Sequence, residues 1–422
     1  MAPSAHAGVR NRPNTIMQPL STACHGRCQG WKRTMIKAGF LPMIRRAAFA
    51  LAVFVVPGVM AADADAPFNP PVLNLNAALS LQETLAALPD DATVFVGETH
   101  TRYDHHLVQL ETLRFLHART PNIAIGVEWF QTPFQTHLDD YLAGRTTEAE
   151  MLERTGYFDR WRFDYRLYRP VIEFARANRI PIVALNAPVE LTRKIGEGGL
   201  AALTPEARAS LPADYARGNA IYDARVRKAF NMHPMEGARF ENFLEVMLTW
   251  DETMAATAAA HLAANPGRRM VIFAGSGHIA HRDGIPARLE RRTGKRVSTV
   301  LVAGEHTAEP GIADFFVLSA PRELPPAGLL GAYLENAKDG VRVGALTEES
   351  GLGMAGIAKD DILLAIDGKP VSGFAAVKMH LLDKKPGDKI DVRYRHRNWL
   401  GSEKESTVMV MLGGESPPHL PQ

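Results

Sequence analysis

The chain has 422 residues, more than one typical domain, so two or three domains are expected. Hydrophobic residues make up 46% and charged residues 22%, as in an ordinary soluble globular protein. The net charge of +2 hides an asymmetry, because residues 1–46 hold eight Lys and Arg and no acid, which leaves 40 basic against 46 acidic residues in the remainder. That balance excludes a basic nucleic-acid-binding surface, and we expect no nucleic-acid partner.

Residues 1–62 are predicted to be a targeting segment. The basic stretch leads into an apolar run at residues 47–56 and then into small residues, which are the parts of a secretory signal peptide. The run is too short to span a bilayer, so we expect an exported, periplasmic protein that is soluble once the segment is removed. Met35 and Met43 would each make a more typical start. Both cysteines, Cys24 and Cys28, fall in this segment, and their spacing fits no metal or haem-attachment motif.

Strand and helix patterns alternate through the main domain, residues 63–306. Continuous apolar runs predict strands at residues 93–96, 123–127, 180–185, 270–274 and 297–302. Helical patterns are found at residues 79–88, 105–117, 170–178 and 285–293, together with a long helical insertion at residues 190–264. This alternation predicts an α/β fold with a mostly parallel sheet covered by helices.

Several polar side chains follow the predicted strands. Two strands end in Gly-x-x-His, which supplies Glu98, His100 and His278, and Glu128 follows another strand. Ligands of open α/β sheets bind outside the carboxyl ends of the strands, so we expect these four residues to form one site. Two imidazoles and two carboxylates suit a divalent metal or metal-free acid–base chemistry. The alternative is that the acids cap helices and the glycines permit tight turns.

The insertion carries an apolar stripe that includes Met247, Trp250 and Met254 at helical spacing. The stripe is interpreted either as the wall of a pocket for a flat hydrophobic ligand or as the core face of a helix. Tyrosines are found nearby, and a tyrosinate is one known ligand of ferric haem iron. The sequence does not indicate which phenol faces a pocket.

Four motifs together resemble the haem-binding uptake family ChaN of the Tiki superfamily. They are the segments 97–100, 127–130, 250–254 and 275–278, and the resemblance covers residues 73–302. It implies an α/β domain that binds haem in a role linked to iron uptake, and two haems stacked across a homodimer are one arrangement it implies. The superfamily also contains metal-dependent proteases and hydrolases that use paired Gly-x-x-His motifs. The chain lacks the lipoprotein cysteine common in the family, and no motif identifies the family's haem-ligating tyrosine.

A Pro-rich linker is predicted at residues 307–326, although residues 315–318 read as a strand of the first domain. Residues 327–413 resemble a bacterial PDZ domain of the kind attached to HtrA proteases, and residues 414–422 read as a tail. Such domains bind an extended peptide as an added strand. The resemblance places the peptide-binding loop at Gly328, Leu329, Leu330 and Gly331, with Val377 and His380 on the groove helix.

Three functions remain open from the sequence. The first is an exported haem-binding protein whose PDZ domain binds a partner peptide. The second is a metal-dependent hydrolase in which Glu98, His100, Glu128 and His278 hold a divalent ion that activates water. The third is a non-catalytic adaptor. Whether the chain is an enzyme is left undecided at this stage.

Overall fold

The computed structural model describes residues 77–217, 219–232, 239–397 and 400–414. The predicted targeting segment, both cysteines and the tail beyond residue 414 lie outside these ranges. Within the described residues, no helix is both long and apolar enough to cross a membrane.

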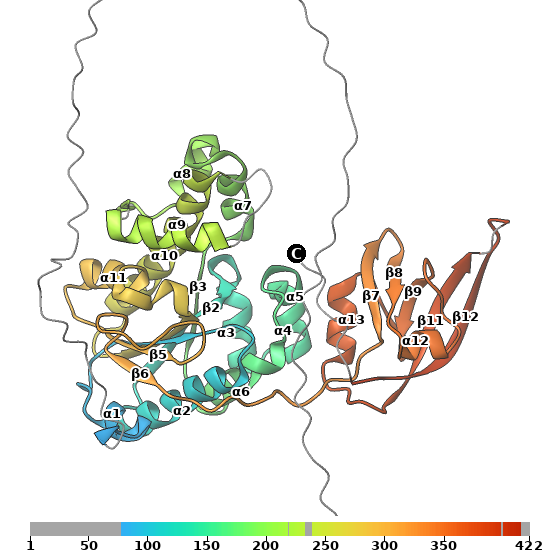
Figure 1. The fold of residues 1–422 in the computed structure, drawn as a ribbon, viewed down its shortest axis with the longest axis horizontal. Coiled ribbons are helices and arrows are strands. Elements are labelled where there is room, and N and C mark those ends of the chain that lie inside the picture. Colours follow the sequence, from blue (N-terminus) through green and yellow to red (C-terminus); the bar gives the residue numbers. More distant parts are fainter. Residues whose placement is uncertain (1–76, 218, 233–238, 398–399, 415–422) are drawn as a thin grey trace, which may run out of the picture. The chain divides into compact units, whose positions relative to one another are not determined.

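A six-stranded parallel sheet forms the centre of the first domain (Figure 1). Its strands are β1 (Val94–Glu98), β2 (Ile123–Gln131), β3 (Ile182–Asn186), β4 (Arg269–Gly275), β5 (Ser298–Val302) and β6 (Phe315–Val317). They lie in the order β3-β2-β4-β1-β5-β6, and each pairing is parallel. The predicted α/β class is confirmed, and β6 extends this sheet into the stretch expected to be a linker.

Helices connect these strands and cover the sheet. They are α1 (Leu81–Ala86), α2 (Tyr103–Arg119), α3 (Gln135–Leu142), α4 (Glu148–Thr155), α5 (Tyr157–Arg160), α6 (Tyr165–Ala177), α7 (Val189–Gly198), α8 (Pro205–Ala209), α9 (Ala220–Met232), α10 (Phe240–Ala264) and α11 (Ile285–Thr293). The sequence did not predict α3, α4 or α5, which are short and depend on local signals. Helix α4, for example, begins with a capping box between Thr147 and Glu150. The long insertion is divided into α7, α8, α9 and α10.

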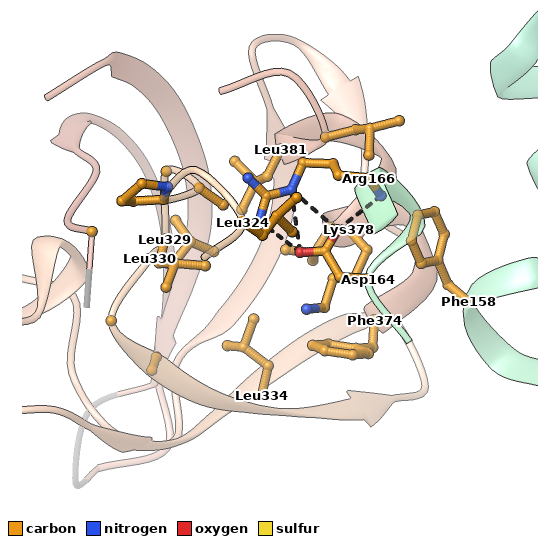
Figure 2. A pocket seen from close by; sticks show the side chains of 18 of the residues that line it. Phe158, Asp164, Arg166, Leu324, Leu329, Leu330, Leu334, Phe374, Lys378 and Leu381 are labelled. Atoms are coloured by element: carbon orange, nitrogen blue, oxygen red, sulfur yellow. Dashed lines mark hydrogen bonds and ion pairs between the residues drawn. The ribbon is translucent and has the colours of Figure 1, made fainter. Parts of the chain in front are cut away.

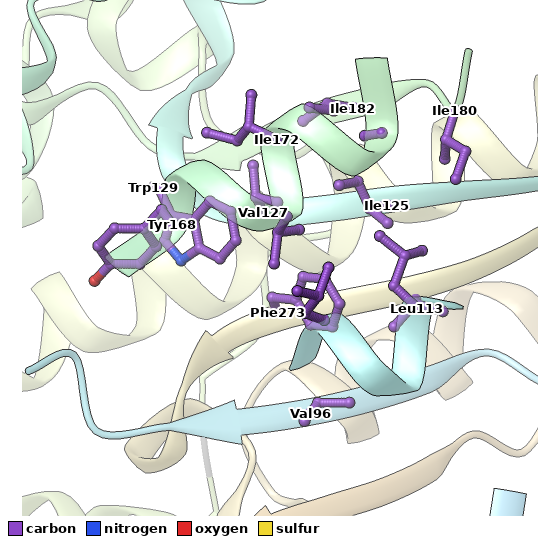
Figure 3. Packing of buried hydrophobic residues seen from close by; sticks show 14 of the residues in the cluster. Val96, Leu113, Ile125, Val127, Trp129, Tyr168, Ile172, Ile180, Ile182 and Phe273 are labelled. Carbon is purple, nitrogen blue, oxygen red and sulfur yellow. The ribbon is translucent and has the colours of Figure 1, made fainter. Parts of the chain in front are cut away.

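The two faces of the sheet carry separate hydrophobic clusters because strand side chains alternate in direction. The face shown in Figure 3 includes Val96, Ile125, Val127 and Phe273 from the strands, Leu113 from α2 and Ile172 from α6. On the other face, Ile272 packs in a cluster with Met254 of α10 and Leu289 of α11. Full burial of one such side chain contributes about 1.5–3 kcal/mol, so both helix layers hold the strand ends in place.

The second domain is built on an antiparallel sheet. Its strands are β7 (Ala332–Ala337), β8 (Gly340–Leu346), β9 (Ile362–Ile366), β10 (Lys369–Pro370), β11 (Lys389–Arg397) and β12 (Glu403–Met411), with helices α12 (Gly351–Met354) and α13 (Phe374–Leu381). The order is β12-β11-β9-β8-β7, and β10 pairs with β9. The predicted small β-rich domain is confirmed, and β7 is an edge strand.

Candidate functional site

Three neighbouring central strands bring the predicted site residues to one edge of the first sheet. Glu98 ends β1, Glu128 lies near the end of β2, and His278 lies in the 3-10 turn Ser276–His278 that follows β4. Because β4 pairs with both β1 and β2 in parallel, the carboxyl ends of all three strands meet. His100 follows β1 by two residues.

Backbone contacts join the ends of β2 and β4. The Gly275 amide donates a 2.7 Å hydrogen bond to Glu128 Oε2. A methyl group on Gly275 would lie 2.9 Å from His100 Cε1 and 3.5 Å from the same carboxylate oxygen. His100 and Glu128 therefore approach one point, and the absence of a side chain at Gly275 leaves room for the His100 ring. Asn186, at the end of β3, donates to the backbone oxygen of Glu128 at 3.0 Å.

Glu98 is a buried carboxylate that faces two imidazoles. Its Oε1 accepts a 2.9 Å hydrogen bond from His100 Nδ1, and its Oε2 lies 2.8 Å from His106 Nδ1. Burial by itself would raise the pKa of Glu98, but the charge of His106 and the hydrogen bond from His100 outweigh it and lower the pKa. Glu98 is therefore an ionised hydrogen-bond acceptor that fixes the orientation of the His100 ring.

His278 is enclosed by carboxylates on both sides of its ring. Its Nδ1 donates to Asp251 Oδ1 at 2.6 Å, and its Nε2 lies 3.4 Å from Glu128 Oε1. Burial opposes the charged form, but Glu128 and Asp251 raise the pKa of His278 to about 10. Tyr222 of α9 donates to the second oxygen of Asp251 at 2.7 Å. His278 is therefore a buried cation with neither ring nitrogen free.

His100 has a hydrogen bond at only one ring nitrogen, and although burial opposes its charged form, the Glu98 hydrogen bond and the charge of Glu128 raise its pKa. Its Nδ1 is occupied by Glu98, while its Nε2 has no hydrogen-bond partner among the described residues. Its side chain is 28% exposed. The rings of Trp161 and Phe163 lie 4.8 and 4.7 Å from the imidazole, centroid to centroid. The result is a half-buried imidazole with an unused nitrogen between two aromatic side chains.

The predicted pocket wall on α10 is divided between different environments. Met254 is fully buried in the cluster between α10 and the sheet, and Met247 packs within the insertion. The Trp250 ring lies 6.0 Å from that of His278, edge to face. An apolar stripe on a helix has the same sequence pattern whether it forms a core face or the wall of a ligand pocket. Of these three residues, only Trp250 lies beside the strand-end site.

The tyrosines near this site are largely protonated phenols. Tyr157 and Tyr168 are buried, and burial raises the pKa of both well above that of a free phenol. The Tyr168 hydroxyl donates to the backbone oxygen of His100 at 3.3 Å. Burial therefore favours the neutral phenol at both positions.

Sequence reasoning assigned no role to Asp251. Its signal in the sequence was an acidic residue directly after Trp250 of the apolar stripe. The structure buries this acid fully, and a buried carboxylate requires a partner. Among the described residues, no group of three or more His, Cys, Asp and Glu side chains is arranged to hold a metal ion. Glu98, His100, Glu128 and His278 form carboxylate–imidazole pairs instead.

The second domain holds a groove between β7 and α13 (Figure 2). All four residues of the predicted loop, Gly328, Leu329, Leu330 and Gly331, line it, as does Val377. His380 lies elsewhere, because its Nε2 contacts the backbone oxygen of Pro370 at 3.0 Å. Phe374, Lys378 and Leu381 of α13 and Leu334 of β7, which the sequence did not single out, also line the groove.

The loop before β7 offers backbone donors to this groove. The Leu329 amide donates to Gly413, whereas the amides of Leu330 and Gly331 donate to no described residue. Gly331 has φ +72, and a Cβ there would lie 2.6 Å from the Ser350 Cα, so both the turn and the close approach require glycine. Unpaired amides beside an edge strand suit capture of a peptide carboxylate and strand addition.

Comparison with protein families matches residues 84–289 to "Haem-binding uptake, Tiki superfamily, ChaN" and residues 328–412 to "PDZ domain". A curated relative, Protein RETICULATA-RELATED 5, chloroplastic, of Arabidopsis thaliana, is 24% identical over 254 residues, which are 54% of this chain. That match covers 34% of the relative, so the chain spans about a third of its length.

Two solved structures are similar to parts of the chain. One is described as cofacial heme binding to ChaN of Campylobacter jejuni, at 16% identity and a TM-score of 0.46, covering 56% of this chain and 91% of that one. The other is the HtrA-type protease AlgW with a decapeptide, at 17% identity and a TM-score of 0.20, covering 22% of this chain and 31% of that one.

Proposed function

We propose that this chain, which carries a ChaN-type haem-binding uptake domain followed by a PDZ domain, binds haem at the strand-end site and a partner's carboxyl-terminal peptide in its second domain. The role proposed for it is haem or iron acquisition by an exported protein. Export is supported by the basic stretch and apolar run of residues 1–62.

The observation that carries the haem proposal is the unused Nε2 of His100. Its Nδ1 is bonded to Glu98 at 2.9 Å, which holds a proton on Nδ1, so that Nε2 carries the lone pair when the ring is neutral. Carboxylate-oriented imidazoles of this kind are the usual arrangement around metal-ligating histidines. A bound haem would supply an iron that a histidine nitrogen can ligate, and His100 would provide that nitrogen. The residues present fit this group, because Trp161 and Phe163 offer aromatic faces beside the imidazole.

The structure distinguishes the two histidines of the Gly-x-x-His motifs. His278 has a carboxylate at each ring nitrogen, at 2.6 and 3.4 Å, and is held as a cation. A protonated imidazole has no lone pair for a metal. We therefore propose that His100 would hold the iron of a bound haem and that His278 would balance charge beside it.

The test is titration of hemin into the protein lacking residues 1–62, followed by absorbance. We expect a saturable Soret band that His100→Ala shifts or abolishes and that His278→Gln retains. His261→Ala, which removes a histidine on α10 away from the strand ends, is the matched control. An unchanged spectrum in His100→Ala would refute the assigned ligand, and no Soret band in the unsubstituted protein would refute haem binding.

Hydrolysis is a second candidate, favoured by the buried chain from Tyr222 through Asp251 and His278 to Glu128. Such a chain holds a proton donor beside a carboxylate, the elements of acid–base catalysis. In its metal-dependent form, Glu98, His100, Glu128 and His278 would hold a divalent ion, which would supply activated water for hydrolysis. Stoichiometric metal by elemental analysis, lost in a His100→Ala/His278→Ala double variant, would favour this candidate over haem binding.

A further inference from the structure

The groove of the PDZ domain is built to receive a strand in one direction. β7 pairs with β8 along one edge, and no described strand pairs with it along the other. The unpaired amides of Leu330 and Gly331 lie at the beginning of β7. A peptide whose terminal carboxylate is held there runs antiparallel to β7, with its last residue beside the loop.

Helix α13 forms the other wall, and its direction is fixed by contacts at both ends. The Phe374 amide, at its start, donates to Asn336 near the end of β7 at 2.7 Å. The backbone oxygen of Lys384, just after the helix, accepts from the Gly328 amide at 2.8 Å. Leu381 therefore lies beside the peptide's last residue, and Phe374 lies beside residues further from its end.

Helix and strand geometry then give the register. Alternate side chains of an extended peptide point the same way, so the last residue and the third residue from the end both face α13, about 6.7 Å apart. At about 1.5 Å per helical residue, Lys378 lies about 4.5 Å and Phe374 about 10.5 Å along α13 from Leu381. Along the axis of α13, the third residue from the end of the peptide therefore lies between Lys378 and Phe374.

Lys378 gives that position a charge preference. Its side chain is exposed, and its ammonium lies over the Phe374 ring at 5.4 Å from the centroid. No described carboxylate forms an ion pair with it, and it is the one charged residue that the described part of the PDZ domain contributes to the groove lining. Leu330, Leu334 and Val377 of the PDZ domain, which line the same groove, are apolar.

We propose that this groove selects a partner carboxyl terminus with an apolar last residue and an acidic third residue from the end, glutamate above others. The glutamate methylenes cover the Phe374 ring, and its carboxylate meets the Lys378 ammonium. This inference rests on the proposed peptide-binding function and adds the class of peptide.

The test measures the binding of fluorescent decapeptides to the full chain by anisotropy. The peptides end in glutamate–alanine–leucine, glutamine–alanine–leucine or lysine–alanine–leucine. An exposed ion pair contributes only modestly to the binding free energy. We therefore expect the glutamate peptide to bind about threefold tighter than the glutamine peptide and about tenfold tighter than the lysine peptide. The preference shrinks at high salt, because screening weakens an exposed pair.

Lys378→Glu should reverse the order, so that the lysine peptide binds best. Lys389→Glu, which makes the same charge change at an exposed position on β11, should leave the order as it was. Equal binding of the three peptides, or an order unaffected by Lys378→Glu, overturns the charge preference alone. If no peptide with a free carboxylate binds, the peptide-binding function itself fails, and the preference fails with it.

Discussion

Replacing Asp251 by asparagine tests whether His278 is held as a buried cation. The change keeps the shape of the side chain and an oxygen for the Tyr222 hydroxyl, but removes the charge 2.6 Å from His278 Nδ1. Breaking a buried ion pair costs about 3–5 kcal/mol. Because Glu128 remains 3.4 Å from the other nitrogen, we expect a loss at the low end, about 3 kcal/mol of unfolding free energy at pH 6.

The pH dependence gives a sharper signature than the loss itself. The pKa of His278 is about 10 in the folded protein and about 6.5 in the unfolded chain. Its stabilisation is therefore complete below pH 6.5 and is lost as the pH rises toward 10. One proton held by the folded state alone gives a slope of about 1.4 kcal/mol lost per pH unit. Asp251→Asn lowers the folded pKa, so its slope should be shallower and the deficit should shrink toward pH 9.

The assay is urea unfolding at intervals from pH 6 to 9.5, followed by tryptophan fluorescence. In the protein lacking residues 1–62, whose removal eliminates Trp31, the residues Trp129, Trp161 and Trp250 report on the first domain, and a Trp399→Phe background removes the signal of the second. Asp139→Asn, at an exposed carboxylate of α3, is the matched control and should run parallel to the unsubstituted protein. If Asp251→Asn also runs parallel to it at every pH, the paired-cation reasoning is wrong.

Three further substitutions test other contacts. Glu98→Gln should lose about 1.5–3 kcal/mol of unfolding free energy at pH 7. Because the pKa of Glu98 is lowered in the folded state, the stabilisation by its carboxylate is present above about pH 4.3 and is lost as the pH falls. Urea unfolding at pH 4 should therefore show a smaller difference between this variant and the unsubstituted protein. Gly275→Ala places a methyl 2.9 Å from His100 Cε1; overpacking of about 1–3 kcal/mol should weaken hemin binding about tenfold or more, and unchanged affinity would place hemin elsewhere. Gly331→Ala forces a side chain at φ +72 and 2.6 Å from the Ser350 Cα, so calorimetry should find a lower melting temperature for the second domain and anisotropy weaker peptide binding, whereas two unchanged values would contradict the strained turn.

Much of the fold of the first domain could be predicted from the sequence of its strands, because a parallel strand that is buried on both faces appears as a continuous apolar run. Glu98, His100, Glu128 and His278 were identified because they directly follow such runs. Which of these side chains contact one another could not be predicted from the sequence. The order of β1, β4 and β2 in the sheet decides which side chains meet, and no local pattern encodes that order.

Partners distant in the sequence could not be inferred. Asp251 lies 27 residues from His278, and Tyr222 lies 29 residues from Asp251, so their contacts depend on how α9 and α10 pack. The sequence also did not determine which face of the short helix α13 lines the groove. On α13, sequence reasoning chose Val377 and His380, whereas Val377, Phe374 and Lys378 face the groove.

The position of β4 between β1 and β2 has a consequence for how the domain folds. The two strands that emerge first during synthesis do not pair with each other, and each pairs instead with residues 269–275. An N-terminal fragment ending at residue 264 therefore has β1, β2 and β3 and most of the helices but lacks β4, the strand that joins β1 to β2. Folding of this domain depends on contacts between residues some 150–180 positions apart in the sequence, which makes folding slow. Until β4 has been synthesised, the apolar strands remain exposed to aggregation and need protection by chaperones.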